Sequence, residues 1–282
     1  MLLARRACLL HTAAFVTGLR ALPTLPSTRH GRRHLSMAAF ANVEKSDEDQ
    51  RAYRVVSLPK TGVRCMLVSD PRAEKRAAAA MSVAVAGYRV APRGLDGLAH
   101  YLEHMVLLGS HKYPVENHYK RTVAKYNGRS NAATAAEDTT FRFEVDVESF
   151  EEVLDVFAQF FVGRPLLSAS VSDRELMAVD AEDARNRLND ARRFIQVLKH
   201  TGVGDGTRGA QTFQKFSTGN ANTLSAEAGD KLGVNVRAAL LAFRDRFYTP
   251  EVRSRPRACW RWRCRHPHPH PHSRTPSPLP RP

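Results

Sequence analysis

The stretch GLAHYLEHMVLLG, residues 97–109, carries the pattern that decides the fold and its chemistry. Its apolar residues recur at helical spacing, which predicts a helix over residues 94–109 with Asp96 as N-cap and Gly109 as the stop. Within it, His100 and His104 are four positions apart. On a helix, this spacing places both imidazoles on one face, about one turn apart.

Two imidazoles at this spacing can bind one Zn²⁺ ion at roughly 2.0–2.1 Å. Glu103 lies on the rim of the same face, where its carboxylate can take a proton from a water that the metal activates. A zinc peptidase site has three protein ligands and an open position, so a third ligand must come from another segment. The order H-x-x-E-H inverts the commoner zinc motif. The alternative is a helix whose two histidines meet only solvent or core hydrogen bonds.

The sequence on both sides of this helix mixes strand and helix patterns. Alternating and β-branched runs predict strands at residues 53–58, 63–69, 78–86, 129–135 and 139–146. Helical spacing predicts further helices at residues 115–126, 149–161, 172–198 and 236–248. Because strands and helices are interspersed with hairpin turns, we expect an α+β fold with a mixed, mainly antiparallel sheet packed with helices.

The charge of the chain is concentrated at its two ends. The formal net charge of the 282 residues is +15, but residues 44–250 carry only about +2 of it. A nearly neutral centre argues against specific nucleic-acid binding. No apolar run reaches 18 residues, so a membrane span is not expected. Of the four cysteines only Cys65 lies in the centre, where we expect a small buried side chain rather than a disulfide.

Residues 1–43 are rich in arginine and contain no acidic residue. This composition is typical of an organellar transit peptide, and residues 1–20 can form an amphipathic helix. We therefore expect a disordered targeting segment that directs the protein to a mitochondrion or plastid. A secretory signal is the rival interpretation. Met37 offers an alternative start for a shorter, cytoplasmic form.

Residues 251–282 form a tail rich in arginine, proline and histidine. Proline at this density prevents helix and sheet, so we expect the tail to be disordered. Metal binding by its cysteines and histidines, and nucleic-acid binding by its tryptophans and arginines, are weaker interpretations. The alternating His-Pro repeat favours a translated intron or a frame error.

The stretch 97–109 resembles the active-site helix of the insulinase-type (pitrilysin, M16) peptidases, which carry the inverted zinc motif. Further similar segments are Lys112–Pro114, Ser130–Ala132, Glu137–Thr140, Ala178–Glu182 and Phe213–Asn220. The resemblance covers about residues 50–250 and is strongest to the branch of insulin-degrading enzyme and nardilysin. It implies a zinc metalloendopeptidase domain that acts on peptide substrates.

The resemblance also implies roles for individual residues. It assigns the third zinc ligand to Glu182 and a supporting carboxylate to Glu175, which the seven-residue spacing places on the same helix face. Asn131 and Ala132 match an edge strand that aligns extended peptides. The likeness stops near residue 250, where the family continues. Residues 44–250 are therefore expected to be an incomplete N-terminal domain that lacks a C-terminal half. The alternative is a truncated, non-catalytic fragment or binding module.

Overall fold

The computed structural model describes residues 13–17, 44–58, 63–73, 75–163, 165–166, 169–201 and 214–248. The tail over residues 251–282, predicted to be disordered, lies outside them. Most of the predicted targeting segment lies outside them as well.

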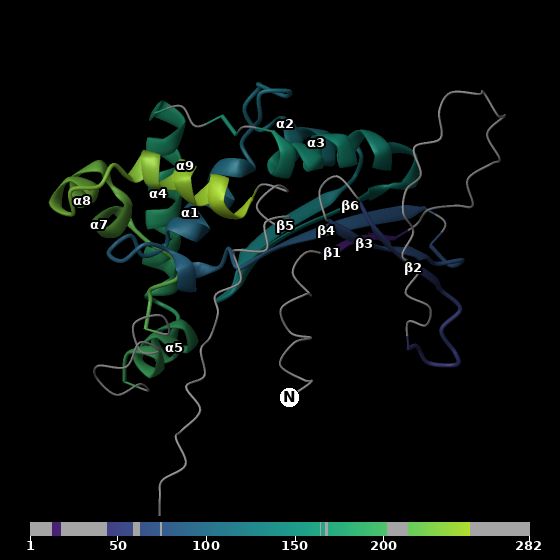
Figure 1. Ribbon diagram of the computed structural model, residues 1–282, viewed down its shortest axis with the longest axis horizontal. Coiled ribbons are helices and arrows are strands. Elements are labelled where there is room, and N and C mark those ends of the chain that lie inside the picture. Colours follow the sequence, from purple (N-terminus) through teal and green to yellow (C-terminus); the bar gives the residue numbers. More distant parts are fainter. Residues whose placement is uncertain are drawn as a thin grey trace, which may run out of the picture.

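The described strands form a single mixed sheet (Figure 1). In chain order they are β1 (Ala13–Thr17), β2 (Ala52–Ser57), β3 (Arg64–Ser69), β4 (Arg76–Ala84), β5 (Arg129–Thr134) and β6 (Asp138–Asp146). Their order across the sheet is β2-β3-β1-β4-β6-β5. Every neighbouring pair is antiparallel except β1 and β3. The predicted α+β class with a mainly antiparallel sheet is confirmed.

Strand β1 departs from the sequence prediction. Residues 13–17 belong to the segment predicted to be disordered, in which residues 1–20 can form an amphipathic helix, yet they are extended and lie between β3 and β4. Phe15, Val16 and Thr17 are residue types that are common in strands, and backbone pairing with two neighbours holds the segment extended. In this position β1 joins the hairpin of β2 and β3 to the rest of the sheet.

The sheet turns one apolar face towards the helices. Along β6 the buried residues Thr139, Phe141, Phe143 and Val145 alternate with more exposed ones. This period of two marks a strand with one face in the core and the other towards solvent. Helices α2 and α3 cover the core face (Figure 1).

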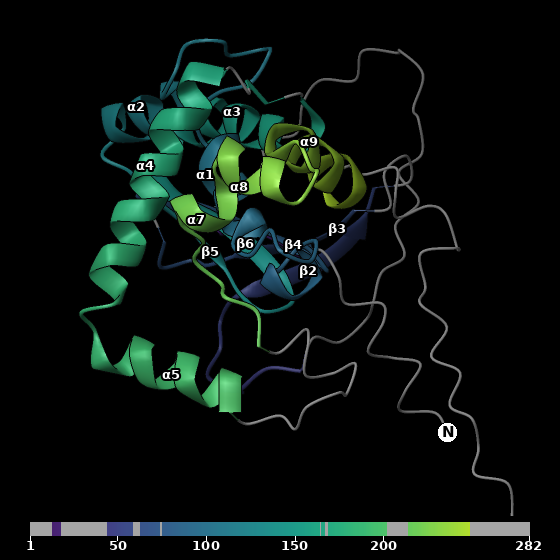
Figure 2. The ribbon, with the colours of Figure 1, turned by 90° about the vertical axis from the view of Figure 1, so that its left-hand side faces the viewer.

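The helices and 3₁₀ turns complete the described fold. The α-helices are α1 (Leu98–Val106), α2 (His118–Lys125), α3 (Phe150–Val162), α4 (Ala169–Asn186), α5 (Asp190–Thr201), α7 (Ala221–Leu224), α8 (Ala226–Lys231) and α9 (Val236–Phe247). Two 3₁₀ turns are η2 (Tyr88–Val90) and η3 (Val147–Ser149). Figure 2 shows α1 enclosed by α4, α9 and the sheet, whereas α5 leads away from the other helices.

Two helix boundaries differ from prediction. Helix α1 is shorter than expected, and its N-cap is Gly97 rather than Asp96. Gly97 has φ +88° and lies so close to Gly219 that a Cβ would be 2.2 Å from the Gly219 Cα, so only glycine fits. The single helix expected over residues 172–198 is two, because the Asn189 side chain accepts a hydrogen bond from the Arg192 backbone N–H and starts α5 anew.

Aromatic side chains fill the core between the sheet and the helices. Phe141 on β6 packs edge-on against Phe161 and Tyr248, and Phe143 packs edge-on against Phe157. These offset contacts add to the burial of large apolar surfaces. The same core encloses α1, whose Leu98, Ala99, Leu102 and Met105 have no exposed surface. The helix that carries the two histidines is therefore fixed by packing.

The position of β1 leads to a prediction about the N-terminal segment. Deleting residues 1–36, which starts the chain at Met37, removes the strand that bridges β3 and β4. We expect the midpoint of thermal unfolding, measured by circular dichroism, to fall by about 10 °C, because two backbone ladders are lost. An unchanged midpoint would show that the sheet does not depend on β1.

Candidate metal centre

The two motif histidines lie side by side on the less buried face of α1. Their ring centroids are 4.8 Å apart and the ring planes are nearly perpendicular. The side chains of His100 and His104 are only 12% and 24% exposed. The predicted shared face is therefore present, and both imidazoles point towards one cavity.

Glu182 on α4 completes a group of three possible ligands. Its Oε2 lies 3.5 Å from His100 Nε2 and 3.8 Å from His104 Nε2, and the three ligand atoms lie within 4.8 Å of one another. Atoms that share a tetrahedral zinc ion at 2.0–2.2 Å are about 3.4 Å apart. Two imidazoles and one carboxylate are also a donor set that zinc accepts, so the residues fit a zinc ion.

Each histidine is oriented by a partner at its Nδ1 atom. His100 Nδ1 lies 2.8 Å from the Thr218 carbonyl oxygen, and His104 Nδ1 lies 3.1 Å from Glu175 Oε2. Both partners are acceptors, so each ring has a proton on Nδ1 and turns Nε2 towards Glu182. Such contacts fix the tautomer of a metal-binding imidazole.

The carboxylates around His104 change its acid–base behaviour. Burial lowers the pKa of His104, but the hydrogen bonds to Glu175 and Glu182 outweigh burial and raise this pKa to about 9. The same hydrogen bond with His104 lowers the pKa of Glu182 to about 2. At neutral pH the metal-free His104 is therefore protonated, and a metal ion must displace a proton to bind Nε2.

Glu103 occupies a different environment from Glu175 and Glu182. Its side chain is buried between α1 and β5, and its Oε2 accepts a 2.6 Å hydrogen bond from Thr134 Oγ1. Burial raises the pKa of Glu103, although Thr134 and the two imidazoles act in the opposite direction. A carboxylate with a raised pKa takes up a proton more readily, which suits it to act as a general base.

Helix α4 is held in place by contacts at both ends. Near its start, the Tyr101 hydroxyl on α1 donates to the Ser172 carbonyl oxygen at 2.6 Å. Near its end, the buried Asp183 accepts from Asn220 Nδ2 at 3.1 Å, and Asp180 accepts from the Ala221 backbone N–H at 2.9 Å. Glu182 therefore lies on a helix that is fixed both to α1 and to residues 218–221, the strip that contains Thr218.

Strand β5 forms one side of the cavity at this centre. The cavity has a volume of about 480 Å³, and its lining includes His100, Glu103, His104, Glu175, Glu182 and most of β5. β5 lies at the edge of the sheet, where one row of backbone groups has no strand partner in the described sheet. Asn131 and Ala132 are on this strand, as the sequence comparison implied, and both line the cavity.

In the structure, all of the site residues predicted from the sequence line the cavity at the metal centre. The structure also adds residues that were not predicted. The motif and its spacing gave no sign of Thr134, Thr218 or Asp183, which support Glu103, His100 and α4 respectively. Lys120 and Arg192 also line the cavity and were not expected there. Residues 213–220 resembled the family, which is the one signal that pointed to the Thr218 strip.

Comparisons with known proteins agree with this geometry. The family model described as Insulinase (Peptidase family M16) matches residues 65–211. The chain is 41% identical over 208 residues to insulin-degrading enzyme from Homo sapiens and 41% identical over 208 residues to insulin-degrading enzyme-like 1, peroxisomal, from Arabidopsis thaliana. Each alignment covers 74% of this chain.

A solved structure gives the same result at the level of the fold. The crystal structure of pitrilysin superposes with a TM-score of 0.66 at 36% sequence identity, covering 76% of this chain and 21% of pitrilysin. The chain spans about one fifth of the length of the curated relatives that it matches. The family match, the sequence identity and the shared fold together show that this chain belongs to the insulinase family of peptidases, family M16.

Proposed function

We propose that residues 44–248 carry the zinc site of a metalloendopeptidase. The observation that supports this most strongly is the convergence of His100, His104 and Glu182, whose ligand atoms lie within 4.8 Å of one another. Both histidines are already oriented for binding by Thr218 and Glu175. In this proposal the three residues hold Zn²⁺, and Glu175 positions His104.

Zinc, when bound, supplies Lewis acidity that polarises a peptide carbonyl and lowers the pKa of water. Glu103 acts as general base: its carboxylate accepts a proton from the attacking water and delivers it to the nitrogen of the leaving amine. Thr134 holds one carboxylate oxygen of Glu103 by a hydrogen bond and so fixes its direction. The other carboxylate oxygen is left to exchange the proton.

The edge strand β5 provides a place for the substrate backbone. An extended peptide that pairs with β5 would add a strand to the sheet and lie along the cavity. Asn131 contributes a side-chain amide and Ala132 leaves room for the peptide beside Glu103. The substrates are therefore extended peptides.

A second candidate function is a binding module without catalysis. The chain spans about one fifth of the length of these relatives. In this view the domain needs a C-terminal half, on the same or another chain, to enclose the substrate. We expect the chain alone to cleave peptides slowly.

The location of the protein remains a prediction from residues 1–43. Among the described residues, no helix combines the length and apolar character that crossing a membrane requires. One relative is named as peroxisomal. We propose a mitochondrion or plastid, with a cytoplasmic form from Met37 as the alternative.

Zinc affinity should fall less when the carboxylate that orients His104 is changed than when the ligand Glu182 is changed. Relative to the unchanged chain, Glu175→Gln is expected to weaken zinc binding by about 10–100-fold, because it removes the negative charge of the carboxylate that orients His104. Glu182→Gln is expected to weaken it more, since it removes a ligand. Competition with a zinc chelator measures both affinities.

The matched control for this series is Glu151→Gln, an exposed carboxylate on α3 that is distant from the centre. The series is made in a chain whose tail histidines 266, 268, 270 and 272 are glutamine and whose Cys259 and Cys264 are serine, so that these tail side chains cannot bind zinc. Equal affinities for Glu182→Gln and Glu151→Gln would contradict the ligand assignment.

Glu103→Gln should separate metal binding from catalysis. Glutamine keeps the hydrogen bond from Thr134 but cannot take up a proton, so we expect hydrolysis of a quenched fluorescent peptide to fall at least about 100-fold. Zinc content, measured by elemental analysis, should stay the same. A variant that retains the full rate would exclude Glu103 as the base.

A further inference from the structure

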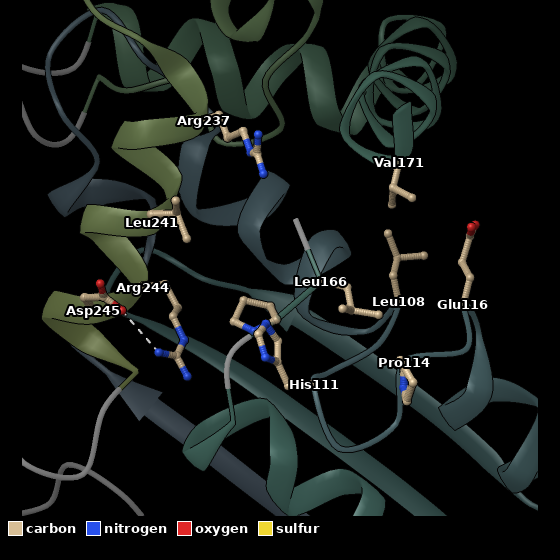
Figure 3. Close-up of a pocket in the computed structure, with 11 residues that line it drawn as sticks. Leu108, His111, Pro114, Glu116, Leu166, Val171, Arg237, Leu241, Arg244 and Asp245 are labelled. Atoms are coloured by element: carbon tan, nitrogen blue, oxygen red, sulfur yellow. Dashed lines mark hydrogen bonds and ion pairs between the residues drawn. The ribbon is translucent and has the colours of Figure 1, made fainter. Parts of the chain in front are cut away.

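A second cavity lies apart from the metal centre. It has a volume of about 650 Å³ and shares no lining residue with the cavity that contains His100 and His104. One wall is the face of α9 that carries Arg237, Leu241 and Arg244 (Figure 3). The rest of the lining is mostly apolar: Leu108, Pro114, Pro165, Leu166 and Val171 lie together with His111, Glu116 and, from α9, Asp245. A volume of this size suits a ligand of several hundred daltons.

Arg244 is a buried cation at the edge of this cavity. Its residue surface is only 5% exposed. The guanidinium donates to the Gly163 carbonyl oxygen and, at 3.1 Å, to Asp245 Oδ1, but its Nε has no hydrogen-bond partner among the described residues. A buried donor without a partner is costly, so the site gains from an additional acceptor nearby.

Arg237 adds a second positive charge on the same face. It lies seven positions before Arg244, two helical turns away, with Leu241 between them. Figure 3 shows the Arg237 side chain reaching over the cavity. The two acidic lining residues already accept hydrogen bonds from other arginines: both Glu116 oxygens accept from Arg174 at 2.6 Å, and Asp245 Oδ1 accepts from Arg244 at 3.1 Å. The cavity thus offers cations beside a mostly apolar lining.

We propose that this cavity binds the C-terminal carboxylate of a peptide whose last residue is apolar. In the last residue of a peptide, the carboxylate and the side chain are attached to the same carbon. The carboxylate can therefore bind the two arginines that flank Leu241 while the side chain contacts the apolar part of the lining. An aspartate or glutamate side chain offers the anion without the apolar neighbour. The basic tail of this chain is a poor occupant, since it has eight arginines to one acid and its arginines would be repelled by Arg237 and Arg244.

The test compares two peptides that differ in one group. A fluorescein-labelled hexapeptide ending in alanine and leucine is prepared as the free acid and as the C-terminal amide. Polarisation measures its binding to the full chain carrying Glu103→Gln, so that hydrolysis does not interfere. We expect the acid to bind about tenfold more tightly than the amide, because only the acid makes charge-assisted hydrogen bonds.

The variants assign the binding to the cavity. Arg237→Gln should weaken binding of the acid about tenfold and leave the amide unchanged, while the thermal unfolding midpoint is retained because Arg237 is exposed. Arg246→Gln, an exposed arginine on the same helix outside the cavity, is the matched control.

Three outcomes would overturn the proposal. The first is equal binding of acid and amide, and the second is acid binding that Arg237→Gln leaves unchanged. The third is binding that depends on Glu182 instead of Arg237, which would place the peptide at the metal centre. Because none of the cavity residues belongs to the metal centre, failure here leaves the proposed peptidase function untouched.

Discussion

The contact between Gly97 and Gly219 is the constraint on which the metal centre depends. Neither position has room for a Cβ, so the start of α1 and the strip around Thr218 approach closely. That approach brings the Thr218 carbonyl to His100 Nδ1, and the same strip holds the end of α4 through Asp183. One backbone contact therefore positions ligands on two helices that are distant in sequence.

The three glutamates at the metal centre have pKa values shifted in different directions, because their surroundings differ. Glu175 and Glu182 face His104, and hydrogen bonds with that imidazole lower the pKa of both carboxyls. Glu103 lines the same cavity but is buried between α1 and β5, where burial raises its pKa. Carboxylates that stay charged suit metal binding and orientation, whereas one with a raised pKa suits proton transfer.

Local patterns allowed much of the fold and site to be predicted. Helical spacing gives α1 and the shared face of His100 and His104, and alternation gives β4, β5 and β6. Glu182 has no local pattern that marks it as a ligand, and only the family resemblance identified it. Thr218 lies 118 positions from His100, so no spacing rule connects them. Strand β1 was missed because no spacing rule predicts its pairing with β3 and β4, which holds it extended.

The most direct test of the proposed site is to identify the atoms that surround the bound zinc ion. X-ray absorption at the zinc edge, recorded on the chain whose four tail histidines are glutamine and which is loaded with one equivalent of zinc, distinguishes nitrogen and oxygen neighbours from sulfur. Ligation by His100, His104 and Glu182 predicts two imidazole nitrogens and oxygen at about 2.0–2.2 Å, with no sulfur. Sulfur at about 2.3 Å, which only the cysteines of this chain supply as thiolate, would place the metal elsewhere and contradict the assignment.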